Sequence, residues 1–240
     1  MSAMKNIELE NLPPDRLQKM ADAGAEIVEC YRVLQKADAN IVGEILREQG
    51  TFYEWDHYPK GDIFDNETHS QYYYHAHRSE TGEHGHFHTF VRRDGMPEGV
   101  EPIAQTSEEE WPTGDDVICH VIAIAMDKFG FPTHLFTTNR WVTGENWFKG
   151  PDVVALADRF IIDHAGPSWP VNRWLTAMVA LFHPQIAALV EQRDVAITAH
   201  REGHPDVDTF EDRDFEITSV AKIDVDDQIA CVNRALAASR

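Results

Sequence analysis

The sequence predicts an α+β fold, with a central antiparallel sheet built from hairpins and packed against N-terminal and C-terminal helices. Apolar residues recur at helical spacing in 1–50, alternate with polar and aromatic residues in 71–138, and return to helical spacing in 151–240. No linker-like composition separates these parts. We therefore expect one α+β domain over 1–240, comprising a helical N-terminal part, a sheet and a mostly helical C-terminal part.

The N-terminal part predicts two helices followed by a loop. The first helix opens at Pro13-Pro14-Asp15 and runs to about Leu34, and Gly24 on its apolar face allows a close neighbour. The second, in ANIVGEILREQG, ends at Gly50. The segment TFYEWDHYPKGDIFDNETHS that follows is rich in aromatic and turn residues, and we expect a structured loop.

The middle part predicts hairpins. Residues 71–78 and 84–92 alternate as strands around a four-residue loop, 79–82. After an acidic excursion over 94–115, DVICHVIAIAMD is apolar on both faces, as expected of a central strand, and FPTHLFTTNRW continues it as a second hairpin.

The C-terminal part predicts helices. A short helix begins at Pro151 and leads to a candidate strand, RFIID (159–163). Ser168 and Pro170 begin a helix to about 183, Pro184 begins another to about 199, and a final helix covers about 226–238 after an acidic loop over 203–216.

The composition excludes several classes of protein. A formal net charge of −20 disfavours nucleic acid or an anionic membrane as the main partner. Cys30, Cys119 and Cys231 are far apart, which excludes a disulfide framework and a zinc ribbon. The first residues show no apolar signal segment, and the longest apolar stretch, VIAIAM, is too short to span a bilayer. We expect a cytoplasmic protein whose oligomeric state is open.

The segment YYYHAHRSETGEHGHFHTF (72–90) carries five of the thirteen histidines. Alternation keeps each strand's histidines on one face, and a four-residue loop places His75 opposite His86 and Tyr73 opposite His88. His77 then lies opposite His84. The aromatic residues between them point to the other face, toward the helices. A loop of three or five residues would instead divide the histidines between the two faces.

This pattern indicates a metal site, because imidazoles from two adjacent strands can converge on one ion. We expect His75, His77 and His86 as the metal ligands. His84 and His88 are candidates for a fourth ligand or a proton relay, and with Tyr73 they form the catalytic set. The cofactor is a transition metal ion, Fe, Cu or Zn, with haem as an alternative.

Residues outside the hairpin are expected to complete the site. The aromatic loop 52–58, with Trp55, is placed to roof it and contact the substrate. Arg140 and Arg173, each followed by a tryptophan, can grip an anionic small-molecule substrate, or can simply stack on tryptophan as structural residues. His120, in the central strand, is expected to be a core histidine.

Three families share local features with the chain. HGHFHTF resembles the alternating histidines of histidine-triad nucleotide hydrolases, which implies His86 as the nucleophile, although Gly85 and Thr89 depart from that motif. HAH and PTHLFTTN resemble cupin motifs in logic but not in spacing. Most of 30–190, including HSQYYYHAH, LFTTNRWVTGE and SWPVNRW, resembles a bacterial family without an established function, which implies no activity.

The expectation on function is a metal-dependent enzyme, an oxidoreductase or a hydrolase, that acts on a small molecule. Three alternatives remain: a non-catalytic haem- or metal-binding protein, a metal-free binding domain whose histidines respond to protons, and a histidine-triad-like nucleotide hydrolase.

Overall fold

The computed structural model describes residues 7–76, 82–105 and 109–239, and within them six strands form one antiparallel sheet. The strands follow each other across the sheet in chain order: β1 (Tyr58–Phe64), β2 (Ser70–His75), β3 (Gly85–Arg92), β4 (Ile118–Met126), β5 (Pro132–Thr138) and β6 (Ile217–Lys222). The helices are α1 (Pro14–Gln35), α2 (Ile41–Leu46), α3 (Arg140–Thr143), α4 (Gly150–Ala157), α5 (Trp169–Leu181), α6 (His183–Gly203) and α7 (Val225–Ala238). Short 3-10 helices are η1 (Leu9–Asn11), η3 (Arg93–Gly95) and η4 (Gly114–Asp116). The predicted α+β class is confirmed.

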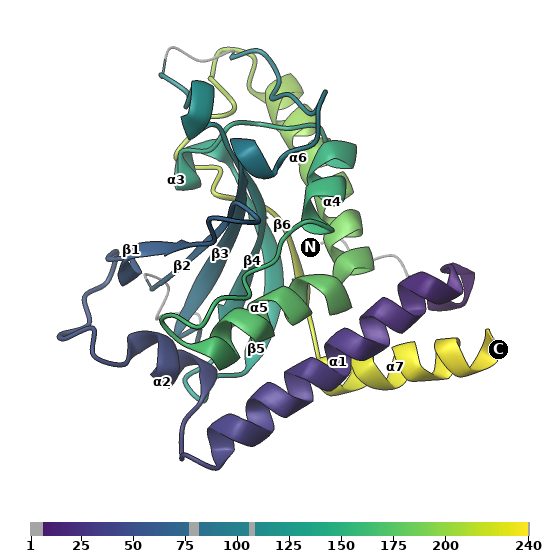
Figure 1. The fold of residues 1–240 in the computed structure, drawn as a ribbon. Helices are drawn as coiled ribbons and strands as arrows, with labels where there is room; N and C mark the ends of the chain where they lie inside the picture. Colours follow the sequence, from purple (N-terminus) through teal and green to yellow (C-terminus); the bar gives the residue numbers. More distant parts are fainter. Residues whose placement is uncertain (1–6, 77–81, 106–108, 240) are drawn as a thin grey trace.

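The helices form two layers beside the sheet (Figure 1). Helices α4 and α6 pack on β4, β5 and β6, α5 contacts β2 and β3, and α1 lies on α5 with α7 against α1. Residues that alternate along the strands meet this layer: Tyr72 donates its hydroxyl hydrogen to Asn172 of α5 at 2.6 Å, and Phe87 packs against Trp174. Within the described residues no single helix is long and apolar enough to cross a bilayer, and only α5 and α6 counted together, bent by 69°, pass that test.

Gly24 has the role that its position on the apolar face of α1 predicts. A Cβ at this position would lie 2.9 Å from Cγ1 of Ile229 in α7, which is closer than two carbon atoms can pack. The absence of a side chain at Gly24 therefore allows α7 to pack closely against α1.

The predicted strands of the first hairpin and the central strand are confirmed to within three residues, but two edge strands were not predicted. β1 occupies the second half of the segment expected to be a loop, and β6 follows the acidic loop. Edge strands pair on one side only and carry weaker periodicity than central ones. β1 is further interrupted by a register shift between Tyr58 and Ile63, within which Gly61 and Asp62 have positive φ.

The prediction of a strand at 159–163 is wrong. The segment forms no strand, and side chains hold its backbone. The N–H groups of Ile161, Ile162 and Asp163 donate to Ser70 Oγ, Thr176 Oγ1 and Asp65 Oδ2. Because buried backbone groups need only some partner, side-chain acceptors replace the ladder of a sheet.

Candidate metal centre

The register of β2 and β3 is the one expected from a four-residue loop. Tyr73 lies opposite His88 and His75 opposite His86, so these four side chains share the face of the sheet that points away from the helices. Tyr72, Tyr74 and Phe87 occupy the helix-facing side, as predicted. His77 and most of the loop lie outside the described residues.

Three histidines converge on this face: His75, His86 and His88, hereafter the triad. One ring nitrogen of each lies within 4.8 Å of the others. Nε2 of His75 is 2.8 Å from Nε2 of His86, and their rings are nearly perpendicular, at 86°. Two nitrogens bound to one ion at about 2.05 Å are about 2.9 Å apart at a right angle and about 3.3 Å apart in a tetrahedron. The triad could therefore hold a metal ion with small side-chain movements.

The triad is buried in protein. His86 and His88 are inaccessible to solvent, and His75 is 7% exposed. Without a bound ion, several buried imidazoles must stay neutral and hydrogen-bond to each other. A metal ion would instead coordinate one nitrogen of each of the three rings.

Glu83 orients His86. Its carboxylate accepts a hydrogen bond from Nδ1 of His86, and its side chain is 11% exposed. With the proton on Nδ1, the lone pair of Nε2 faces the other two triad histidines. A carboxylate behind a histidine in this way is the usual support of a metal-ligating imidazole, because it fixes the tautomer and makes the ligand more basic.

His120 orients His88 in the same way. Nδ1 of His88 lies 3.0 Å from Nε2 of His120. Burial lowers the pKa of His120 to about 3, with Arg193 adding to the effect, so His120 stays neutral and one of its nitrogens is a hydrogen-bond acceptor. When Nε2 of His120 accepts from Nδ1 of His88, Nε2 of His88 is left as the ligand atom.

His120 is a buried, hydrogen-bonded histidine as expected, and a β-bulge brings it next to the triad. Thr89 lies opposite Ile122, but the next residue, Phe90, lies opposite His120, so Val121 is skipped. Without the bulge Val121 would face the triad and His120 the helices, because each shift of one residue exchanges the faces of a strand. The hydroxyl of Thr89 donates to the Ile122 carbonyl and accepts from the Ile122 N–H, at 2.7 and 3.2 Å.

His84 does not join the triad, although alternation predicts that it should. The ladder of β3 begins at Gly85, and Nδ1 of His84 is 2.7 Å from the hydroxyl of Tyr74, a residue of the helix-facing side. Burial lowers the pKa of His84. The alternating set His84, His86 and His88 is thus not presented on one surface, which removes the geometric basis of the histidine-triad hydrolase alternative.

Gly85 makes this arrangement possible. A Cβ here would lie 2.5 Å from the Tyr74 hydroxyl and 2.6 Å from the His75 carbonyl oxygen. The glycine that departs from the histidine-triad motif therefore lets the two strands and the Tyr74 ring approach each other beside the triad.

His57 covers the triad face from the loop before β1. Its ring stacks on that of Tyr73 with centroids 3.6 Å apart, and meets the edge of the His75 ring at 5.7 Å. Nδ1 of His57 is 3.0 Å from Oδ1 of Asp62, whose other oxygen accepts from Gln71 at 2.7 Å. The positive φ of Asp62, +60°, takes it out of the β1 ladder to make this contact.

Trp55, expected in the roof, and Tyr73, expected in the catalytic set, differ in exposure. Trp55 is 67% exposed, and its backbone N–H donates to the Ala76 carbonyl. Tyr73 is buried between His57 and His88, and burial raises the pKa of its phenol, with Asp62 and Glu145 contributing. The phenol of Tyr73 is therefore protonated at neutral pH and can only donate or accept hydrogen bonds.

The two arginines expected to grip an anion are engaged elsewhere. Nε of Arg140 is 2.5 Å from Glu211, and Nε of Arg173 is 2.9 Å from Glu26. Each guanidinium also lies over a tryptophan, Trp111 and Trp169 respectively, rather than the tryptophan that follows it in sequence. The structure brings neither arginine to the triad, and these contacts favour the structural interpretation.

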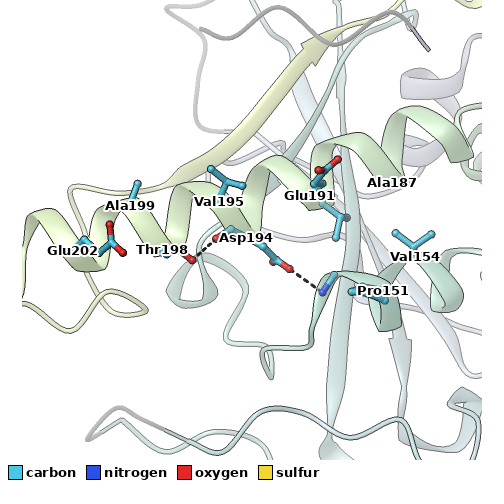
Figure 2. A pocket seen from close by; sticks show the side chains of 11 residues that line it. Pro151, Val154, Ala187, Glu191, Asp194, Val195, Thr198, Ala199 and Glu202 are labelled. Carbon is cyan, nitrogen blue, oxygen red and sulfur yellow. Dashed lines mark hydrogen bonds between the residues drawn. The ribbon is translucent and has the colours of Figure 1, made fainter. Parts of the chain in front are cut away.

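A groove of about 770 Å³ lies between α4 and α6 (Figure 2). All of its lining residues belong to these two helices, and none belongs to the sheet or the triad. Figure 2 shows Asp194 of α6 reaching the backbone N–H at the start of α4, which ties the two walls together. The groove is separate from the candidate metal centre.

Comparison with known proteins gives a family but no activity. A family model described as a domain of unknown function matches residues 21–223. No curated protein and no solved structure matches the chain. The chemistry of the triad is therefore the evidence on function.

Proposed function

The chain belongs to the family of the domain of unknown function DUF6969, and we propose that it is a metal-dependent enzyme acting on a small molecule through the triad. The observation that carries the proposal is the convergence of three buried imidazoles from two adjacent strands. The support that Glu83 and His120 give to two of these imidazoles strengthens it, because a merely structural histidine needs no such arrangement of its tautomer.

The donor set selects the metal. Three neutral nitrogens suit Zn, Fe or Cu, and not Mg or Ca, which prefer oxygen ligands. Haem takes one or two axial ligands from protein, so three imidazoles around one point favour a single bare ion. Such an ion supplies a Lewis acid that activates water, or a centre that binds an oxidant.

The protein residues then have distinct tasks. The triad would hold the ion, and Glu83 and His120 hold the tautomers of His86 and His88. His57 lies on the same face of the sheet, stacked on Tyr73 and at the edge of the His75 ring, and is oriented by Asp62. His57 is placed to exchange a proton with a molecule bound at the ion, because Nδ1 faces the Asp62 carboxylate and leaves Nε2 for that task.

A second candidate is a metal-binding protein without catalysis. The observation that favours it is the depth of the triad, since two of its three histidines have no solvent access. The two candidates differ in whether a coordination position is open to an external molecule.

Elemental analysis of untagged protein tests the metal. We expect about one equivalent of Fe, Cu or Zn, bound by the three histidines. His75→Ala, His86→Ala and His88→Ala should each abolish tight binding, because two ligands remain. His204→Ala, an exposed histidine on no strand, is the matched control and should retain the metal.

Two outcomes would overturn the proposal. Folded protein that is purified without metal and takes up none on titration with Zn, Fe or Cu has no such site. Metal retained equally by the three triad variants would place the ion elsewhere. His77→Ala tests the ligand that the sequence predicts but the triad does not include. Loss of metal binding in this variant as well would make His77 a fourth ligand.

A further inference from the structure

A cavity of about 260 Å³ lies beside the triad on the same face of the sheet. Its floor is formed by one residue from each of three neighbouring strands, Ala125 of β4, Phe136 of β5 and Val220 of β6. Glu83, Thr133 and His134 also line it. The helices pack on the opposite face of these strands, so the cavity is independent of the groove in Figure 2.

Two residues of the cavity floor are neighbours of His86. Ala125 is the residue opposite His86 across β3 and β4, and the Phe136 ring meets the His86 ring edge-on with centroids 5.2 Å apart. Neighbouring strands are about 4.8 Å apart, so the floor begins one strand away from the triad. Glu83 belongs to both places, because the carboxylate that lines the cavity is the one bound to His86.

The lining selects the chemistry of an occupant. The floor is apolar, and the volume corresponds to about nine water molecules, which suits a single ring with a short side chain. Glu83 is the one carboxylate among the lining residues that the structure describes. Burial lowers the pKa of His134, which also lines the cavity. Lys222, opposite His134 on the edge strand, is solvent-exposed and outside the lining.

We propose that this cavity binds the substrate of the metal centre, and that the substrate is a small primary amine with an apolar body. The body lies on Ala125, Phe136 and Val220, and the ammonium donates to the Glu83 carboxylate. A carboxylate offers about four lone-pair positions, so Glu83 can accept from His86 and from an ammonium together. This assignment rests on the proposed metal function, since it names the substrate of that site.

Three probes with the same phenyl ring test the charge preference. The metal-loaded full chain is titrated calorimetrically with benzylamine, benzyl alcohol and benzoate. We expect benzylamine to bind at least about tenfold more tightly than benzyl alcohol, because the ammonium forms an ion pair with the carboxylate as well as a hydrogen bond, whereas the alcohol is a neutral donor. Benzoate should bind weakest. Equal affinities, or a preference for benzoate, would overturn the proposal without any variant.

Two variants locate the binding. Val220→Trp fills the cavity from the edge strand and should abolish benzylamine binding, while Val195→Trp, on the exposed surface of α6, should leave it unchanged. Glu83→Gln should reduce the affinity for benzylamine about tenfold and that for benzyl alcohol less, because only the ammonium loses an ion pair. Circular dichroism verifies the fold of each variant, and unaltered benzylamine binding by folded Val220→Trp would contradict the assignment.

Metal content, measured on the same samples, separates the two proposals. If the protein contains metal but binds no benzylamine, the proposed metal function stands and the proposed amine substrate is wrong. If the protein binds benzylamine in the cavity but takes up no metal, the proposed binding site stands and the proposed metal function is wrong.

Discussion

Nδ1 of His88 and Nε2 of His120 lie 3.0 Å apart, ring to ring between two central strands, although 32 positions separate them in the sequence. The contact exists because the bulge at Thr89 and Phe90 exchanges the faces of β4. It joins the triad to a histidine that the hairpin itself does not contain.

The first prediction concerns this contact. His120→Phe keeps a ring of similar shape but removes the acceptor for Nδ1 of His88. We expect the dissociation constant for metal to rise about 10- to 100-fold, with about one equivalent still bound at saturation. Competition titration with a chelator measures it, and His204→Phe is the control. An unchanged dissociation constant would make His120 a packing residue.

The second prediction concerns Gly85. In Gly85→Ala the new methyl group meets the Tyr74 hydroxyl and the backbone oxygen of His75, and the backbone cannot rotate away. We expect a loss of about 1–3 kcal/mol in the free energy of unfolding, together with weaker metal binding because His75 moves. Denaturant titration and metal titration report the two effects. Gly203→Ala, where a Cβ meets nothing within 4 Å, should show neither.

The third prediction separates an enzyme from a carrier. Three protein ligands leave a coordination position open, so azide should perturb the visible spectrum of the cobalt-substituted protein. His57→Ala should change the azide affinity without releasing cobalt, because its ring stacks on Tyr73 and meets the edge of His75 without belonging to the triad. Trp55→Ala tests whether the exposed indole belongs to the same roof. A spectrum indifferent to azide would favour the carrier.

The fourth prediction concerns stability and pH. Burial raises the pKa of Glu145 from 4.5 to about 8, against the opposing effect of its hydrogen bond from the His120 N–H. The folded state therefore binds a proton that the unfolded state releases between these values, and the stability present below about pH 4.5 is lost as the pH rises to about 8. Glu145→Gln removes the ionisation while keeping an acceptor for His120.

The difference in free energy of unfolding between Glu145→Gln and the natural protein should accordingly grow in favour of the variant over this range, by a few kcal/mol. Urea titrations at intervals of pH measure it. Glu98→Gln, at an exposed position, should show no such trend. Parallel pH profiles for all three proteins would mean that Glu145 is ionised throughout.

The fold class and half of the site could be predicted from alternation alone. The pairs His75–His86 and Tyr73–His88 follow from the parity of a period-two pattern and an even loop, and both were confirmed. The resemblance to a family without an established function is confirmed as well. These pairs depend only on the alternation of neighbouring residues and the length of one loop, so the local sequence is enough to predict them.

The remaining features depend on breaks in the alternation. Nothing in VICHVIAIAM marks the skipped Val121, so the bulge that brings in His120 has no sequence signal. Glu83 and His84 precede the ladder of β3, where alternation no longer fixes the direction of a side chain. Glu83 therefore contacts His86 and His84 contacts Tyr74, although alternation places each pair on opposite faces. His57 lies in the aromatic loop that the sequence places over the site, but its pairing with Asp62 depends on a positive φ that glycine, not aspartate, would signal.

The order of strands across the sheet has a consequence for synthesis. β1 to β5 follow one another in the chain and in space, whereas β6 arrives only after residues 139–216 have been made. Chains emerge from the ribosome N-terminus first, so the three imidazoles and His120 are all translated before Val220, the last part of the cavity floor. The candidate metal ligands are thereby complete in the growing chain before the last residue of the candidate cavity floor is added.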